Sequence, residues 1–425
     1  MTTAIVAVFV ILIVIGAPIA VCLAMASVLP LTFFSNISAI AIIQKCFTSI
    51  DSASLMAVPF FIVAGGLLSE GGVSKRLVDF ASSLVGWLPG GLAIVTFVAS
   101  AFFGAICGSA AATCSAIGAI VVPELTKRGY PLPFSLATVA SAGFLGIIIP
   151  PSIPMIIYGQ ATNTSVNDLF MAGFIPGILL TLSMSTYAFF WGKKNKIPTQ
   201  SFELKEVGRT FVSAIWALIM PIIILGGIYG GIFTATEAGA VSCAYGLFAG
   251  AFIYRELNLK SIIRIIRSSM VTCAMIMFII AVANGFALVL TRENIPQNVS
   301  SALLAISGNS KFLFYLLVTV LLLFVGTFME TVPAIMILAP ILLIALRPLG
   351  IDSVAFGLVM IVNLAIGVIT PPLGLDLYVA AGVGNVPVMT VINKHLLRYG
   401  LCSLAVLILM MIFPQISLWL PSMMK

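Results

Sequence analysis

The chain has 425 residues, of which 61% are hydrophobic and 8% are charged. Soluble globular domains carry roughly 25% charged residues, so the composition excludes an ordinary soluble protein and predicts an all-α polytopic membrane protein. The net charge of +7 is spread over short loops, which suits orientation in a lipid bilayer and gives no argument for nucleic-acid binding.

The N-terminal part predicts retained membrane helices. The first charged residue is Lys45, so the apolar stretch 4–29 lacks the basic region of a cleavable signal peptide and is expected to be one transmembrane helix. A polar turn near Asn36 and a membrane segment over 55–70 follow. Residues 73–84 then place apolar and charged side chains on opposite faces at helical spacing, which predicts an amphipathic helix at the membrane surface.

A first helical hairpin is predicted over residues 90–125. This apolar stretch is interrupted by a run of small and polar residues at 104–115. A re-entrant hairpin needs such a run, because its tip must turn tightly inside the protein. The alternative is a straight span in which small residues allow close helix packing.

Two apolar segments, 135–163 and 353–384, contain the pairs Pro150-Pro151 and Pro371-Pro372. Proline lacks an N–H and clashes with the carbonyl four residues before it, so a helix cannot pass through either pair. Broken membrane helices expose carbonyls that commonly line transporter sites. The alternative is a pair of kinked helices that bind nothing.

The remaining segments complete the topology. The basic loop 193–209 is expected in the cytoplasm by the positive-inside rule. We expect spans at 169–192, 211–232 and 238–254, an amphipathic piece at 255–270, a span at 270–291, a second hairpin at 312–346 and a last span at 396–420 that leads to an external C-terminus.

Glycine spacing predicts an inverted repeat. Gly104 and Gly326, one in each hairpin, differ by 326 − 104 = 222, and Gly146 and Gly367, each four residues before a Pro-Pro pair, differ by 367 − 146 = 221. The order of elements also matches. We therefore expect a first repeat over 1–192 (hairpin 90–125, broken helix 135–163), a connecting region at 193–235 and a second, inverted repeat over 236–425 (hairpin 312–346, broken helix 353–384). Coincidental spacing is the alternative.

The same stretches resemble the large membrane subunit of tripartite ATP-independent periplasmic (TRAP) transporters, a family that includes dicarboxylate and sialic-acid importers. The resemblance runs through nearly the whole chain. Family members more often have proline where Ala235 stands. The matching stretches are 59–67, 128–130, 146–152, 158–159, 173–177, 231–238 and the second Pro-Pro region.

The resemblance implies an elevator-type secondary transporter of the bacterial inner membrane. It implies that an inward sodium gradient drives import of an organic-acid anion, with sialic acid ahead of a C4-dicarboxylate. A periplasmic binding protein would deliver the substrate. A small membrane subunit of about four helices is expected as a separate chain, because the large-subunit pattern begins at residue 1.

Sodium sites are expected where each hairpin tip faces a broken helix, because carbonyl and hydroxyl oxygens can replace the water around the ion. The first tip has no carboxylate between residues 102 and 123, which favours sodium over protons, although Glu330 leaves proton coupling open. No other cofactor is expected. The candidate sodium ligands are Ser109, Ser115, Gly146, Ile149 and Pro150 in the first site, and Gly326, Thr327, Gly367 and Thr370 in the second.

Substrate contacts are expected beyond the Pro-Pro pairs, where the free N–H groups of each new half-helix favour a carboxylate. Ser152 is a candidate there as a helix cap or a ligand, and Tyr158, further along the same segment, is a candidate for lining the substrate path. Glu330 and Asp376 are candidates because acids at membrane depth are usually functional. The alternatives are buried structural contacts for the two acids and helix packing for Tyr158.

Two other functions are considered, one a different kind of transporter and the other an enzyme. A stand-alone sodium/dicarboxylate elevator symporter would share the hairpins and broken helices, and only dependence on a binding protein separates it. An intramembrane enzyme is the less favoured rival: the chain has one histidine and lacks the HExxH, GxSxG and P-loop motifs. The sequence therefore predicts a transporter without enzymatic activity.

Overall fold

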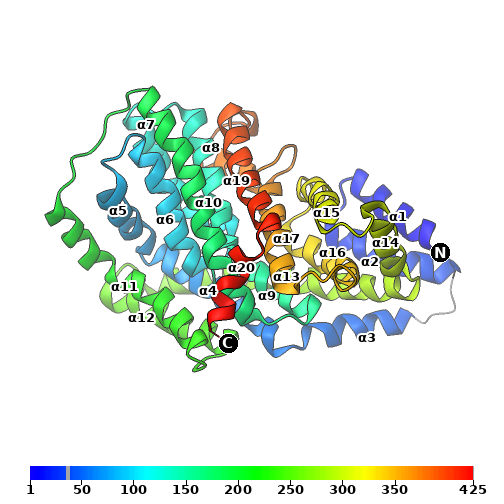
Figure 1. Ribbon diagram of the computed structural model, residues 1–425. Helices are drawn as coiled ribbons and strands as arrows, with labels where there is room; N and C mark the ends of the chain where they lie inside the picture. Colours follow the sequence, from blue (N-terminus) through cyan, green and yellow to red (C-terminus); the bar gives the residue numbers. More distant parts are fainter. Residues whose placement is uncertain (35–38, 425) are drawn as a thin grey trace.

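The computed structural model describes residues 1–34 and 39–424, and every regular element in these ranges is helical (Figure 1). This confirms the predicted all-helical architecture. In the described ranges, six helical segments are long and apolar enough to cross a membrane: Ala53–Glu70, Val166–Lys194, Leu204–Tyr229, Ala235–Ile253, Leu259–Arg292 and Lys394–Ile412.

The N-terminal span predicted over 4–29 is wrong in one respect, because two helices replace it. Helix α1 (Thr2–Val14) ends before Gly16, which has a φ of +81°, and α2 (Ile19–Phe34) begins after Pro18. Glycine adopts this left-handed conformation without penalty and proline cannot continue a helix, so the chain turns here. The two helices pack against each other. The turn predicted near Asn36 lies outside the described residues.

The predicted surface helix is confirmed as α5 (Val73–Val85). Val73 and Leu77 are buried, whereas Lys75 and Asp79 on the opposite face are exposed. The apolar face packs against its neighbours α6 and α11. Three elements precede it: α3 (Ala39–Ile50), the short 3-10 helix η1 (Ala53–Met56) and α4 (Ala57–Glu70).

The first hairpin consists of α6 (Gly91–Cys107) and α7 (Ala110–Lys127), which pack against each other and are joined by two residues. The first broken helix follows as α8 (Leu132–Gly143), the 3-10 turn η2 (Phe144–Ile147) and α9 (Ile153–Thr162). Helix geometry thus stops before Pro150 and resumes after Pro151. The long helix α10 (Val166–Lys194) leads to the basic loop.

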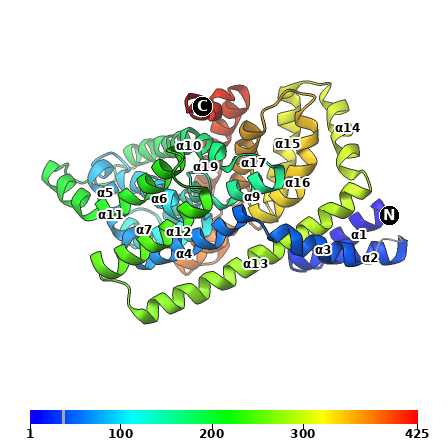
Figure 2. The same ribbon diagram turned by 90° about the horizontal axis from the view of Figure 1, so that it is seen from below.

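The boundary predicted at residue 270 is wrong, because the surface piece and the next span form one helix of 34 residues, α13 (Leu259–Arg292). Its start is fixed by a capping box of Asn258 and Ser261, and no glycine or proline occurs before Gly285 to end it. Figure 2 shows α13 as a long rod along the lower edge of the molecule, where it packs against α2, α3, α4 and α16. Two helices precede it: α11 (Leu204–Tyr229) and α12 (Ala235–Phe248), the latter extended by the π-helical turn η3 (Ala249–Ile253).

In the second half of the chain, a hairpin, a broken helix and a further span again follow one another. After α14 (Ile295–Ser307), the second hairpin consists of α15 (Lys311–Gly326) and α16 (Thr331–Leu346). The second Pro-Pro pair separates α17 (Ser353–Gly367) from α18 (Leu375–Gly384). The last span is α19 (Lys394–Ile412), which ends earlier than predicted because the short helix α20 (Gln415–Met423) starts after Pro414.

Packing brings the two halves together. The second helix of each hairpin contacts the other half: α7 packs against α18, and α16 packs against α9. Each hairpin also packs against the broken helix of its own half. The two tips and the two breaks therefore gather in the middle of the fold.

Candidate functional site

Both hairpin tips and both broken helices line one small cavity of about 60 Å³. A buried water needs roughly 10–15 Å³ on this measure, so the cavity has room for a few waters or an ion. An organic acid is larger, and it would need the surrounding elements to move apart. The cavity is lined by Gly108, Ser109, Ala110 and Ala111 of the first tip, Glu330, Thr331 and Val332 of the second, Ile147, Ile153, Pro154, Val368 and Leu375 around the breaks, and Ile276 of α13.

Main-chain hydrogen bonds join the first tip to the first break. Gly108 has a φ of +66°, and a Cβ there would lie 2.9 Å from the carbonyl oxygen of Pro151. The N–H of Ile153, at the start of α9, donates to the carbonyl of Gly108 over 3.4 Å. Ser109 caps α7 through its side chain, which accepts from the N–H of Ala112. A glycine is required at the tip because the backbone is left-handed and closely packed.

The break itself is held by Ser152, whose side chain is fully buried. Its hydroxyl donates to the carbonyl of Ile147 over 2.6 Å and accepts from the N–H of Met155 over 3.4 Å. One side chain thus satisfies a carbonyl freed by the break and an N–H of the new half-helix. Ser152 acts as the expected cap, and its role as a substrate ligand stays a prediction.

The two halves contain the same close backbone crossing. A Cβ on Gly104 of the first hairpin would lie 2.8 Å from the Cα of Gly146, and a Cβ on Gly326 of the second hairpin would lie 2.9 Å from the Cα of Gly367. These four glycines are those whose spacing predicts the repeat. Only glycine allows two backbones this close. We call these contacts the first and second crossings.

The second tip carries the acid of the cavity. Glu330 is exposed and occupies the cap position before α16, but its side chain makes no capping hydrogen bond. The carbonyl of Thr327 accepts from the N–H of Leu373 over 3.2 Å, which joins this tip to the second break. The cavity lining therefore includes an acidic residue, Glu330, on one tip and a hydroxyl residue, Ser109, on the other.

The two half-helices differ in their free N–H groups, where sequence reasoning expects both to be available. In α9, Ile153 and Met155 donate within the protein, and Pro154 has no N–H to offer. In α18, by contrast, the N–H of Leu375 has no acceptor among the described residues, and Leu375 lines the cavity. The start of α18 is thus the better anchor for an anion.

The structure brings together part of the predicted first sodium site. A Cβ on Gly146 would lie 2.7 Å from the carbonyl oxygen of Ser109, so these two residues are adjacent. Ser115 instead lies on an exposed face of α7. Ile149 packs its side chain beside Gly177 of α10, and the neighbouring Pro150 is joined to Pro151 by a cis peptide bond.

Thr113 belongs to this group and was missed by sequence reasoning. Its hydroxyl donates to the carbonyl of Ser109 over 2.8 Å and faces Gly146, and the side chain is fully buried. The signal was available, because Thr113 follows Ser109 by four residues and residues at this spacing share a helix face.

Replacing Thr113 with valine is expected to lower the affinity of the predicted first site for sodium. Valine keeps the shape of the side chain but removes one oxygen beside Ser109 and Gly146. A contact between an oxygen and the ion is comparable to a hydrogen bond to a charged group, about 1.5–3 kcal/mol, so the sodium concentration for half-maximal uptake should rise about tenfold or more. Sodium titration of uptake in proteoliposomes measures this, with the exposed Ser115→Ala as the matched control. An unchanged titration for Thr113→Val would remove Thr113 from the site.

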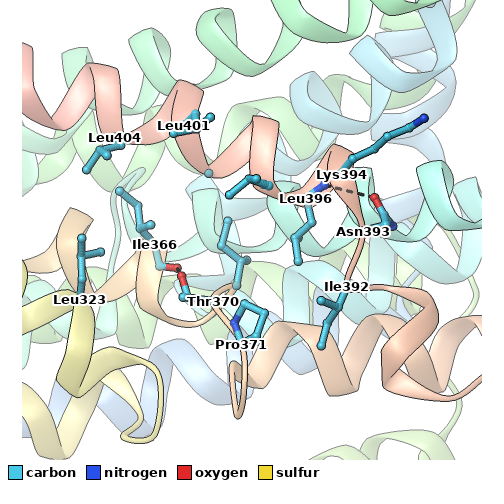
Figure 3. Close-up of a pocket in the computed structure, with 13 residues that line it drawn as sticks. Leu323, Ile366, Thr370, Pro371, Ile392, Asn393, Lys394, Leu396, Leu401 and Leu404 are labelled. Carbon is cyan, nitrogen blue, oxygen red and sulfur yellow. Dashed lines mark hydrogen bonds between the residues drawn. The ribbon is translucent and has the colours of Figure 1, made fainter.

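The residues that line the cavity do not include the four predicted for the second sodium site. Gly326 and Gly367 touch in the second crossing, and Thr327 lies at the tip. The hydroxyl of Thr370 donates to the carbonyl of Ile366 over 2.7 Å, and this side chain lines a different, apolar pocket beside α19 (Figure 3).

Two predicted substrate residues lie away from the cavity. The Tyr158 hydroxyl is bonded to the carbonyl of Ser353 over 2.8 Å and the ring packs on Gly357, as the packing alternative expects. Asp376 is fully buried beside Gly143 and Cys114, and neither carboxylate oxygen has a hydrogen-bond partner among the described residues. A buried acid without a partner is costly when ionised, so it carries a proton or pairs with a cation.

Comparison with known proteins identifies the family. The model of the tripartite ATP-independent periplasmic transporter, DctM component, matches residues 6–416. A C4-dicarboxylate TRAP transporter large permease of Pseudomonas aeruginosa is 41% identical over 94% of this chain and 93% of its own length. A sialic acid TRAP transporter large permease of Vibrio cholerae is 37% identical, with 89% of each chain covered.

A third relative is longer than this chain. The isethionate TRAP transporter permease DctMQ of Oleidesulfovibrio alaskensis is 41% identical over 97% of this chain, which spans 65% of that protein. Among solved structures, the YdaH transporter of Alcanivorax borkumensis superposes with a TM-score of 0.61 at 16% identity and covers 99% of this chain and 98% of its own. That likeness concerns the fold alone. The match across the whole chain and the high identity to large permeases show that this protein belongs to the DctM component family of TRAP transporters, a family of transporters and not of enzymes.

Proposed function

We propose that this chain is the membrane permease of a sodium-driven importer of a small organic anion. The observation that carries the proposal is the cavity shared by two hairpin tips and two helix breaks. Two such elements meeting at mid-membrane are typical of secondary transporters. The proposed motion is of the elevator type, in which hairpins and broken helices move together past the other helices.

Sodium is the proposed driving ion. The oxygen atoms gathered at the first crossing are the carbonyl of Ser109 and the hydroxyl of Thr113, beside the closely packed backbone of Gly146. Such neutral oxygens suit a hard monovalent cation that must shed its water. The matching second crossing is the proposed second site, with Gly326, Thr327 and Gly367.

The proposed substrate is a carboxylate or sulfonate anion held at the start of α18. Leu375 lines the cavity and its N–H has no acceptor among the described residues, so this N–H would donate to the anion, and the Ser109 hydroxyl would donate a further hydrogen bond from the first tip. Glu330 would accept a hydrogen bond from a hydroxyl of the substrate. Sialic acid and C4-dicarboxylates are the two substrates to test first, and isethionate is the third.

The proposed assembly contains two further components, as a tripartite transporter requires. They are a small membrane subunit of about four helices and a periplasmic protein that delivers the substrate. The proposed location is the bacterial inner membrane, with the basic loop after α10 in the cytoplasm.

Uptake by proteoliposomes tests the proposal. The chain is reconstituted with its small subunit, and labelled sialic acid, a C4-dicarboxylate or isethionate is supplied with and without the binding protein and a sodium gradient. Uptake that requires both is the expected result. Sodium-driven uptake without the binding protein would instead identify a stand-alone symporter, and uptake independent of sodium would reject the proposed coupling.

Asp376 gives a separate test of ion coupling. Asp376→Asn keeps the size of the side chain and removes its charge, so the folded protein should be at least as stable to heat. We expect uptake to fall at least about tenfold, because asparagine can neither carry a proton nor pair with a cation, and a contact with a charged group is worth about 1.5–3 kcal/mol. Thermal unfolding and uptake are measured on the same preparation. Normal sodium-driven uptake by the asparagine variant would show that Asp376 serves packing only.

A further inference from the structure

A second cavity, separate from the one between the tips, lies on the outer side of the second break. Its volume is about 460 Å³, within the range of roughly 300–1,000 Å³ that is typical of small-molecule sites. Figure 3 shows leucine and isoleucine side chains of α17 and α19 turned toward one another across it, with Thr370 and Pro371 at its wall. The apolar wall is formed by Leu323, Ile366, Ile369, Leu396, Leu401 and Leu404.

A missing side chain keeps this cavity open. Gly400 lies inside α19 and lines the cavity, and a Cβ added there would meet no atom within 4 Å. Glycine inside a helix costs roughly 0.5–1 kcal/mol relative to alanine. No neighbouring element comes close enough to require glycine at this position. We infer that Gly400 leaves space for a bound molecule.

The chemistry of the wall selects an apolar occupant. Water in such a space would find few hydrogen-bond partners, and empty space forfeits packing contacts. Leu397 and Leu401, at 67% and 55% exposure, lie on α19 beside the cavity and face away from the protein core. In a bilayer this surface contacts lipid acyl chains, so an acyl chain is the apolar ligand that is available to fill the cavity.

A basic side chain at one end of the cavity favours a lipid with an anionic headgroup. Lys394 lines the cavity, makes no ion pair with any described residue, and extends away from the leucines at one end of the view in Figure 3. Its neighbour His395 accepts or shares a hydrogen bond with Tyr187 over 2.7 Å and contacts the ring of Trp191. Such aromatic groups mark the membrane–water interface, where lipid headgroups lie.

We propose that this cavity binds an anionic phospholipid, with one acyl chain between α17 and α19 and the headgroup beside Lys394. The lipid tail then contacts Thr370 and Pro371, and so packs directly against the second break. A basic side chain near the membrane surface contributes enough attraction to favour an anionic over a zwitterionic lipid by about fivefold.

Native mass spectrometry of the chain in mild detergent tests this, with phosphatidylglycerol and phosphatidylcholine of identical acyl chains as probes. The wild type should bind phosphatidylglycerol about fivefold more tightly. Lys394→Gln should remove this preference but retain binding, whereas Gly400→Leu should abolish binding of both lipids. Gly226→Leu is the matched control, because Gly226 is also a helical glycine with no atom within 4 Å of a Cβ but lies in α11, away from the cavity.

Leu404→Trp fills the same space from the next turn of α19 and replaces Gly400→Leu if that variant does not purify. Equal binding of the two lipids by the wild type would overturn the headgroup assignment. Undiminished binding in both filled variants would overturn the site. A copurifying polypeptide released by Gly400→Leu would show that a protein covers this surface instead of lipid.

Discussion

Leu375→Pro is expected to raise the KM for the transported anion by roughly tenfold to a hundredfold. Leu375 is the first residue of α18 and lines the cavity, and its N–H has no acceptor among the described residues. Proline is well tolerated at this helical position and removes only that N–H and part of the side chain. A hydrogen bond to a charged group is worth about 1.5–3 kcal/mol, which converts to the stated range.

The conformation of Gly374 and an alanine control allow the effect of the lost N–H to be measured separately. Gly374 has a φ of −50° and a ψ of 120°, which is the extended conformation that the residue before a proline prefers. Leu375→Ala is the matched control, because it shortens the side chain and keeps the N–H. Concentration dependence of uptake separates the two variants. Equal KM values for both would mean that the start of α18 does not hold the anion.

Gly146→Ala is expected to abolish uptake while the buried cores of both halves remain formed. The added methyl group would lie 2.7 Å from the carbonyl oxygen of Ser109 and also meet the Thr113 hydroxyl, so the first tip must move. Overpacking of this kind costs about 1–3 kcal/mol, and the displaced oxygens are those proposed to hold sodium. Gly367→Ala should act alike at the second crossing, where the methyl group would lie 2.6 Å from the Cα of Gly326.

Gly382→Ala supplies the control for both variants. Gly382 is also helical, but a Cβ there meets no atom within 4 Å, so alanine should leave uptake unchanged. Uptake is measured together with monodispersity in detergent, which reports folding. If Gly146→Ala and Gly382→Ala transport equally well, the first crossing has no part in the transport cycle.

The parts of this fold that local chemistry decides could be predicted from the sequence. Proline pairs end helices in any surroundings, so both breaks follow from their residue types alone. The surface helix α5 follows from its pattern of apolar and charged residues. The glycines spaced by 222 and 221 residues meet in pairs at the two crossings, and the inverted repeat itself stays a prediction.

Other features depend on tertiary contacts or on weak signals. The turn at Gly16 was hidden because apolar residues flank it on both sides. The continuity of α13 was missed because a change in composition near residue 270 resembles a boundary, although no residue there ends a helix. Substrate contact by Tyr158 and Asp376 stays a prediction, and neither residue lines the cavity, because the direction of a side chain is decided by the packing of α9 on α16 and of α18 on α7 and α8.

The two crossings also bear on how relatives of this protein diverge. At each crossing, a hairpin contacts its broken helix through main-chain atoms. Main-chain atoms are the same in every residue type, so substitutions elsewhere in these helices leave this contact unchanged. Ser109 and Glu330 line the cavity, and neither is one of the four crossing glycines, so their side chains can change independently of the crossings. We therefore expect relatives to change substrate specificity by replacing a few such side chains. The crossing glycines should vary less, because any side chain at these positions would separate the two backbones.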